Sequence, residues 1–290
     1  MLSIIINDED NLLRIDKFLC KNFDISFSVA QKLIREKKIK INNSRPNIST
    51  KINTGDQLLI FENLPIRHQN QKLTPVLSLA KQQKFWQNII FEDENLIAIN
   101  KPSGLATQGG SGIEISVDDF VKLKKYHLVH RLDKDTSGIL LIAKNSSTVE
   151  FLTNGFKNKT IHKTYIALVY GILKKTSGTI EIPLSKQSLG KIEKVQPDFE
   201  FGKTAITHYK LISQHKNYCK VELKPITGRT HQLRVHCKEI GHPILNDIKY
   251  GGKKVNFKNF FSRLCLHAVS IEIENYLGKN LIIEANNPKF

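Results

Sequence analysis

Six stretches rich in β-forming residues lie between residues 95 and 273, and several follow one another with no helical pattern between them. They are residues 95–100, 139–143, 164–169, 205–212, 219–223 and 267–273. Helical patterns are expected at 115–125, 147–158 and 230–240. A doubly wound parallel sheet needs a helix between consecutive strands, so this order favours an α+β fold with a mixed, mostly antiparallel sheet.

The first 65 residues have a different pattern, with two short helices followed by two short strands. The first helix is expected around Ile15, Phe18, Leu19 and Asn22, and the second after an N-cap at Ser28, with Val29, Leu33 and Ile34 inward. Strands are expected at 38–42 and at 57–61, the latter after a turn at Gly55 and Asp56. The second helix and the strand after it carry Lys32, Arg35, Lys37, Lys38 and Lys40. Such a basic edge suits a phosphate backbone, although an ordinary solvated helix face has the same composition.

Residues 66–85 contain four basic residues, four glutamines and no acid, which is typical of a polar linker. The sequence therefore predicts a small domain at 1–65, a basic linker at 66–85 and a larger domain at 86–290.

Basic residues outnumber acidic ones by 44 to 27, a formal net charge of +17. A chain this basic most often binds a polyanion, usually nucleic acid, although a lysine-rich proteome from an AT-biased genome gives the same excess. The apolar runs are too short to span a membrane, and we do not expect the apolar start at Met1 to Ile6 to be a signal peptide. Four widely spaced cysteines indicate neither a disulfide framework nor a zinc site, which favours the reducing cytoplasm. Nothing in the sequence demands more than a monomer.

The densest group of reactive side chains is His130-Arg131-Leu132-Asp133-Lys134-Asp135-Thr136-Ser137-Gly138, directly before a predicted strand. Loops at strand ends often carry active groups. The two acids could serve as a nucleophile, a base or a metal site. A charged turn held by Asp and Ser hydrogen bonds would look the same.

A second group is Gly228-Arg229-Thr230-His231-Gln232-Leu233-Arg234-Val235-His236, at a predicted helix start. Amide groups there, together with Arg229 and Arg234, could hold an anion. The histidine spacing does not match a helical zinc pair, so we expect no metal. Tyr165 lies in a strand and taken alone is a packed core tyrosine. Lys101 ends a strand at a turn through Pro102, and the Gly109-Gly110-Ser111-Gly112 cluster lacks the pattern of a phosphate-binding loop.

Taken together and in this order, the segments around Lys101, Asp133, Tyr165 and Arg229 resemble the RluA-type pseudouridine synthases over residues 88–285. The most specific element is His-Arg-Leu-Asp-x-x-Thr-Ser-Gly. Residues 12–62 resemble the S4-type (alpha-L) RNA-binding domain. Three features together resemble the members of the family that modify large-subunit ribosomal RNA. They are the S4-type domain, the stretch Gly109 to Gly112 and the stretch Gly241 to Ile244. Gln108 departs from the pattern, because members commonly have His there.

The resemblance implies an enzyme that isomerises uridine to pseudouridine without cofactor, nucleotide or metal. It implies Asp133 as the catalytic carboxylate, Arg229 as its ion-pair partner and Tyr165 as a ring that stacks on uracil and takes the C5 proton. Arg131 matches the residue that fills the space left by a flipped uridine. We further expect RNA contacts from Lys101, Arg234, Lys32, Arg35, Lys37 and Lys38. A synthase acting on transfer RNA and a non-catalytic ribosome-assembly protein remain the alternatives.

Overall fold

The computed structural model describes residues 1–65, 77–110, 112–189, 192–288 and 290, and the chain folds as two units, Met1–Thr74 and Pro75–Phe290. The first unit contains β1 (Leu2–Ile5), η1 (Asp8–Asp10), α1 (Ile15–Asn22), α2 (Phe27–Arg35), β2 (Ile39–Ile41) and β3 (Gln57–Ile60). Its strands form an antiparallel sheet in the order β1-β3-β2. Apolar residues of both α-helices pack with those of the sheet in a core that belongs to this unit alone.

The predicted second helix is present, but it begins two residues earlier than expected. Ser26 is the N-cap, and its hydroxyl accepts a hydrogen bond from the Val29 amide at 3.3 Å. Val29 is exposed, whereas Leu33 and Ile34 are buried as predicted. The expectation for Val29 was therefore wrong, because its place on the helix turns it away from the core. The apolar start of the chain contains strand β1, which pairs with β3.

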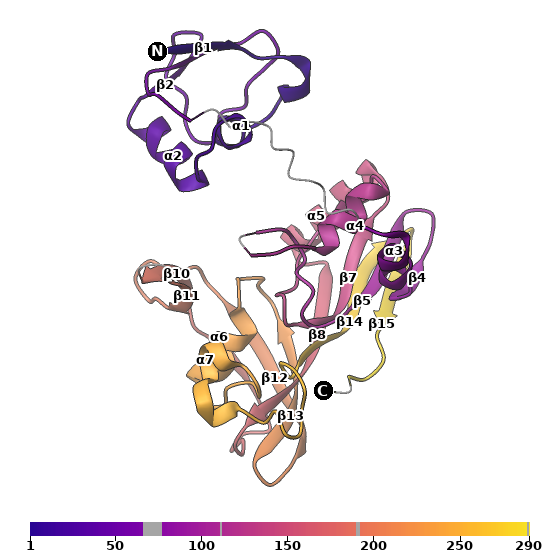
Figure 1. Cartoon of the computed structure of the whole chain (residues 1–290). Coiled ribbons are helices and arrows are strands. Elements are labelled where there is room, and N and C mark those ends of the chain that lie inside the picture. The colour runs from indigo at the N-terminus through magenta and orange to yellow at the C-terminus, as the bar shows by residue number, and fades with distance from the viewer. Residues whose placement is uncertain (66–76, 111, 190–191, 289) are drawn as a thin grey trace. The chain divides into compact units, whose positions relative to one another are not determined.

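The second unit is built on one large sheet with helices packed against it (Figure 1). Its elements are α3 (Leu79–Trp86), β4 (Ile89–Glu92), β5 (Leu96–Lys101), α4 (Val117–Leu123), β6 (His127–Leu128), β7 (Ser137–Ala143), α5 (Ser146–Asn158), β8 (Ile161–Tyr170), β9 (Ser177–Glu181), β10 (Leu184–Leu189), β11 (Ile192–Pro197), β12 (Ile206–Gln214), β13 (Tyr218–Pro225), α6 (Gln232–Glu239), α7 (Ile248–Gly251), η2 (Gly252–Val255), β14 (Leu266–Tyr276) and β15 (Lys279–Glu284).

The main path of the sheet is β4-β5-β7-β14-β8-β13-β12-β9, with β6 paired to β7 and β15 to β14. The β7–β14 pair is parallel, and the other pairs are antiparallel. All six predicted strands and all three predicted helices of this region are present. The α+β fold with a mixed, mostly antiparallel sheet is therefore confirmed.

Both faces of the sheet are covered at strand β7. Its side chains alternate between two cores: Leu140 and Ile142 pack in one with Phe120 of α4, while Ile139 and Leu141 pack in another with Leu152 of α5. This explains why residues 139–143 are an unbroken apolar run, since no face of this strand meets solvent.

Part of the predicted linker is structured. Residues 66–76 lie outside the described residues, but Leu79–Trp86 form α3 of the second unit. Phe85 is buried, and its ring stacks on that of Phe120 in α4 at 4.2 Å between centroids. Only a narrow face of α3 is buried, so most of its residues are polar. The sequence therefore lacks the apolar periodicity by which a helix is predicted.

Gly138 brings β7 and β14 unusually close where the reactive loop ends. A Cβ atom at this position would lie 2.2 Å from the carbonyl oxygen of Ala268, and the backbone has φ +112°. Only glycine fits this close approach without strain. The last residue of the Thr-Ser-Gly motif therefore fixes the loop before β7 against the neighbouring strand.

Candidate active site

The loop that carries Asp133 is held on both sides by the segment after β5. The hydroxyl of Thr107 donates to the Leu132 carbonyl at 2.7 Å and accepts from the Leu132 amide at 3.1 Å. On the other side of Asp133, the Ser103 hydroxyl donates to the carbonyl of Asp135 at 2.6 Å. Side-chain hydrogen bonds of this kind fix a loop whose own backbone forms no ladder. Asp133 is therefore presented from a rigid turn.

Lys101 anchors the same turn from inside the protein and does not face solvent. Its ammonium donates to the carbonyls of Pro102, Leu105 and Lys134 at 2.9, 2.8 and 3.1 Å, and the residue is fully buried. Burial lowers its pKa to about 7, against the opposing charges of Asp135 and Asp133. The prediction that Lys101 contacts RNA was wrong, because all three donors of the ammonium are used inside the protein.

The partner of Asp133 is Arg234, on the first turn of α6. Its Nη1 donates to Asp133 Oδ2 at 3.4 Å, while Nε and Nη2 donate to the two oxygens of Asp247 at 2.7 and 2.8 Å. Burial opposes the charge of Arg234, but the hydrogen bonds and charge of Asp247 outweigh it and raise its pKa. This guanidinium is buried between two carboxylates, yet it lines both pockets at Asp133, so the expected RNA contact of Arg234 stays a prediction.

Arg229 does not form the predicted ion pair with Asp133. It is exposed, and its Nε donates to the carbonyl of Thr204 at 3.0 Å. Helix α6 begins at Gln232, so Arg229 lies in the turn before it. The Gln232 side chain fastens this turn, accepting from the Arg229 amide at 3.0 Å and donating to the Ile206 carbonyl at 2.9 Å. Both arginines border the same pocket, but Arg234 is the one aimed at the carboxylate.

His231 and Tyr250 complete the surroundings of Asp133. His231 is the N-cap of α6 with φ +52°, and its Nε2 lies 3.9 Å from Asp133 Oδ2. Its Nδ1 is 2.6 Å from the hydroxyl of Tyr250, on the short helix α7. Burial lowers the pKa of His231, with Arg234 and Lys249 adding to the effect and Asp133 opposing it. The ring is therefore neutral at physiological pH.

Tyr165 lies on β8 and lines a small pocket of about 110 Å³ together with Asp133. The residue is buried, and this burial, with the nearby charge of Asp133, raises its pKa. Its hydroxyl therefore stays protonated at neutral pH. The structure thus brings Asp133 and Tyr165 together, as the sequence predicted.

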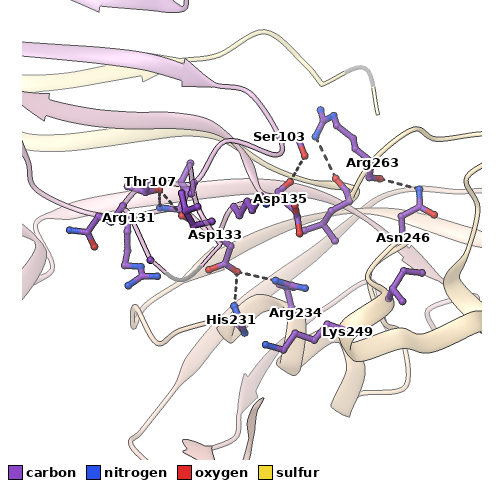
Figure 2. Close-up of a pocket in the computed structure, with 18 of the residues that line it drawn as sticks. Ser103, Thr107, Arg131, Asp133, Asp135, His231, Arg234, Asn246, Lys249 and Arg263 are labelled. Atoms are coloured by element: carbon purple, nitrogen blue, oxygen red, sulfur yellow. Dashed lines mark hydrogen bonds and ion pairs between the residues drawn. The ribbon is translucent and has the colours of Figure 1, made fainter. Parts of the chain in front are cut away.

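Asp133 also lines a larger cavity of about 800 Å³ (Figure 2). Its lining includes cations from several segments, namely Arg131, Lys134, Arg234, Lys249, Lys258 and Arg263. Arg131 is exposed and makes no hydrogen bond or ion pair with any residue that the structure describes. These cations outnumber the two carboxylates of the lining, Asp133 and Asp135. Such a cavity suits a polyanionic substrate that places a neutral group against Asp133.

The four basic residues of the first unit that are expected to contact RNA lie on or just after α2. Lys32 and Lys38 pair with Glu36 and Glu62 at 3.7 and 3.5 Å, and all these side chains are substantially exposed. Exposed pairs of this kind contribute little and open easily. Arg35 reaches Gln31 at 3.4 Å, and Lys37 is exposed. No ligand contact tests these four residues, so their RNA-binding role stays a prediction.

Both ring nitrogens of His236 on α6 form hydrogen bonds within the protein. His236 contacts the Thr207 hydroxyl at 3.0 Å and the Ile182 carbonyl at 3.1 Å. Among the described residues, no three His, Cys, Asp or Glu side chains come together as a metal site. In the same part of the chain, no helix is long and apolar enough to cross a membrane.

Comparison with known proteins agrees with this geometry. The profile of a family described as RNA pseudouridylate synthase matches residues 95–239, and that of the S4 domain matches residues 13–58. The first match spans the Asp133 loop, Tyr165 and the start of α6. The chain belongs to the RNA pseudouridylate synthase family. It is a pseudouridine synthase of the RluA type with an S4 domain.

Curated relatives cover almost the whole synthase. Ribosomal large subunit pseudouridine synthase C of Rickettsia prowazekii (strain Madrid E) is 40% identical over 95% of this chain and 94% of its own length. The protein of that name from Buchnera aphidicola subsp. Schizaphis graminum (strain Sg) is 39% identical over 98% and 93%. Among solved structures, human RNA Pseudouridylate Synthase Domain Containing 1 is 25% identical, with a TM-score of 0.60 over 70% of this chain and 84% of that chain.

Asp247 and Tyr250 are the site residues that sequence analysis missed. Both lie more than 100 positions from Asp133, and nothing in the local pattern connects them with it. The one available signal was an aspartate three residues before the tyrosine, which is the spacing of a helix N-cap. Asp247 does cap α7, accepting from the Tyr250 amide at 3.2 Å.

Proposed function

We propose that this synthase isomerises specific uridines of large-subunit ribosomal RNA to pseudouridine, with Asp133 as the catalytic carboxylate. The observation that carries this proposal is the position of Asp133 at the junction of a cationic cavity and a small pocket with Tyr165. The names of the curated relatives support ribosomal RNA as the substrate. Such a substrate places the enzyme in the cytoplasm.

The reaction breaks the N1–C1′ bond of uridine, rotates the freed uracil and rejoins it through C5, with loss of the C5 proton and gain of a proton at N1. The Asp133 carboxylate can attack the base, attack the sugar or assist departure of the base. Each route needs its charged form in a site that excludes water. Arg234 offsets the cost of that desolvation, because an opposite charge within a few ångströms favours the ionised form.

A uridine in a stem reaches Asp133 only after flipping out of its stack, at a cost of a few kcal/mol. Arg131 is suited to fill the vacated space, since it is exposed and lines both pockets. Tyr165 is suited to stack on the uracil within the smaller pocket and to receive the C5 proton.

The S4 domain and the overall charge of +17 supply affinity for the rest of the RNA. Phosphate contacts of Arg35, Lys37, Lys32 and Lys38 would give binding strength, and RNA shape would give site choice. The two units in one chain can bind neighbouring parts of a large RNA. A monomer is sufficient for this role.

The test is tritium release from RNA labelled at uridine C5, using protein-free large-subunit transcript and, in parallel, transfer RNA transcript. Wild-type enzyme is compared with Asp133→Asn and with Asp118→Asn, a matched loss of one carboxylate on α4, where Asp118 pairs with the exposed Lys122. We expect release from the large-subunit transcript by wild type and Asp118→Asn, and none by Asp133→Asn.

Release from transfer RNA alone would overturn the substrate assignment and leave the chemistry in place. Tight binding of the large-subunit transcript without release from either RNA would favour the non-catalytic alternative. Release by Asp133→Asn at the wild-type rate would remove Asp133 from the mechanism.

A further inference from the structure

The two donors beside Asp133 point to the same oxygen. Arg234 Nη1 lies 3.4 Å and His231 Nε2 lies 3.9 Å from Oδ2 (Figure 2). Within the part of the chain that the structure describes, Oδ1 accepts no hydrogen bond. The carboxylate thus has one held oxygen and one oxygen that is free to react.

The tautomer of His231 follows from the hydrogen bonds of Tyr250. The Tyr250 hydroxyl accepts from the buried Val195 amide at 3.3 Å, and it lies 2.6 Å from His231 Nδ1. A phenolic hydroxyl has a single hydrogen to give. When the Tyr250 hydroxyl donates its hydrogen to His231 Nδ1, its oxygen still accepts from the Val195 amide. This arrangement uses the hydroxyl hydrogen and satisfies both contacts. The remaining hydrogen of the neutral ring is then on Nε2, the atom that faces Asp133.

The backbone of His231 shows that the ring is held in this place. Its φ of +52° is in the left-handed region, which costs a residue other than glycine about 1 kcal/mol. The conformation is compensated by the bond to Tyr250 and by the fixed turn at Gln232. Tyr250 also touches the second donor, since the Arg234 guanidinium lies 5.1 Å from the centre of its ring.

We propose that His231 and Tyr250 are positioning residues for Asp133. Tyr250 fixes the His231 ring so that Nε2–H is directed at Oδ2, and Arg234 holds the same oxygen, which leaves Oδ1 as the oxygen that acts on the uridine. The 3.9 Å separation is longer than a hydrogen bond and shortens when the substrate closes the site, as is usual for catalytic contacts in the unliganded state. This inference rests on the proposed role of Asp133.

The surroundings keep His231 neutral. The charged and titratable groups that face it are Asp133, Arg234, Tyr250, Asp247 and Lys249. Burial is the largest influence and lowers the pKa of the imidazole. A neutral donor suits this place, because it directs the carboxylate without adding a second full charge that would weaken the nucleophile.

The decisive variants are His231→Asn and Tyr250→Phe. Asparagine tolerates the left-handed backbone. Its side-chain amide extends only to the position of the imidazole Nδ1, so the variant lacks the Nε2 group that faces Asp133. Phenylalanine keeps the ring beside Arg234 and removes the hydroxyl. His215→Asn and Tyr218→Phe are matched controls, because both residues lie in the turn and strand at β13, outside the site.

The experiment measures single-turnover tritium release and RNA affinity for each variant on whichever transcript the wild type modifies. We expect the rate at saturating enzyme to fall roughly ten- to hundredfold for His231→Asn and for Tyr250→Phe, with RNA affinity unchanged. The double variant is expected to lose no more than His231→Asn alone, since Tyr250 acts through His231.

A merely structural role would give a different result. Additive losses in the double variant, or losses matched by weaker RNA binding, would overturn the proposal. So would wild-type rates in both single variants. Absence of release by the wild-type enzyme on every RNA would instead contradict the proposed function, so the two failures are distinguishable.

Discussion

Asp247 accepts two hydrogen bonds from Arg234, at 2.7 and 2.8 Å, and thereby leaves one nitrogen of the guanidinium free for Asp133. The buried Asp247 carries a charge that compensates Arg234 before any substrate arrives. Arg234 is thus fixed by one aspartate and directed at another. This geometry separates the roles of the two arginines in the Gly-Arg-Thr-His-Gln-Leu-Arg segment.

Arg234→Gln should therefore be far more damaging than Arg229→Gln. Removing Arg234 leaves Asp247 as a buried charge without its partner, a cost of about 3–5 kcal/mol, and releases Asp133. We expect tritium release to fall more than a hundredfold and the thermal midpoint to drop. Arg229→Gln removes one exposed bond to the Thr204 carbonyl and should cost less than tenfold in rate. Comparable losses in the two variants would show that Arg229, not Arg234, supports Asp133.

Lys101 gives the folding free energy a dependence on pH. Its folded pKa of about 7 is below the usual 10.5, so the unfolded chain binds more protons between these values. Stability contributed by this group therefore rises as pH increases from 7, by up to about 1.4 kcal/mol per pH unit. The difference in unfolding free energy between wild type and Lys101→Met should grow in favour of wild type from pH 7 to pH 9.

Denaturant unfolding followed by tryptophan fluorescence measures this difference, because the single tryptophan, Trp86, lies in the second unit. Lys84→Met, on the same unit and exposed, is the control and should show a constant difference across this range. A constant difference for Lys101→Met would contradict the lowered pKa.

Six strands of the second unit and the reactive loop were predictable because their signals are local, whereas β4, β6, β9, β10, β11 and β15 were not predicted. Residues 139–143 are apolar throughout, and the Asp133 loop is a continuous motif. The partner of Asp133 was not predictable from spacing. Arg229 lies just before the start of α6 and Arg234 lies in its first turn, and the sequence does not show which of them faces Asp133. The role of Lys101 depends on carbonyls from its own turn and from Lys134, and the fold alone brings these together.

Two buried histidines should make the second unit sensitive to acid. Burial lowers the pKa of His130 to about 3 and that of His267 to about 4, with Lys163 and Arg263 adding to the respective shifts. Below pH 6.5 the unfolded chain binds protons that the folded chain does not, so stability falls as pH drops from 6.5 towards 4.

His130→Gln tests this effect, since a glutamine oxygen can accept the Leu141 amide that now donates to Nε2 at 2.9 Å. We expect its unfolding free energy to fall less steeply between pH 6.5 and 4.5 than that of wild type, by about 1 kcal/mol per pH unit. His215→Gln, at an exposed position, should follow the wild-type curve. Parallel curves for wild type and His130→Gln would refute a neutral buried His130.

The hydroxyl of Tyr165 should act in its protonated form. A reaction that needed the phenolate would accelerate about tenfold per pH unit up to the phenol pKa, which burial and Asp133 raise above its usual value of 10. The oxygen of the protonated hydroxyl can accept the C5 proton while the hydroxyl passes its own proton to a water molecule. We therefore expect the single-turnover rate of the wild type to show no tenfold rise per unit between pH 7 and pH 9.

Tyr165→Phe keeps the ring that stacks on uracil and removes this relay. Tritium release should fall at least a hundredfold while RNA affinity stays within about twofold of wild type. Tyr170→Phe, on the same strand β8 but outside the residues lining the pockets around Asp133, is the matched control and should release tritium normally. Normal release by Tyr165→Phe would show that another group takes the C5 proton, and would leave Tyr165 with the stacking role alone.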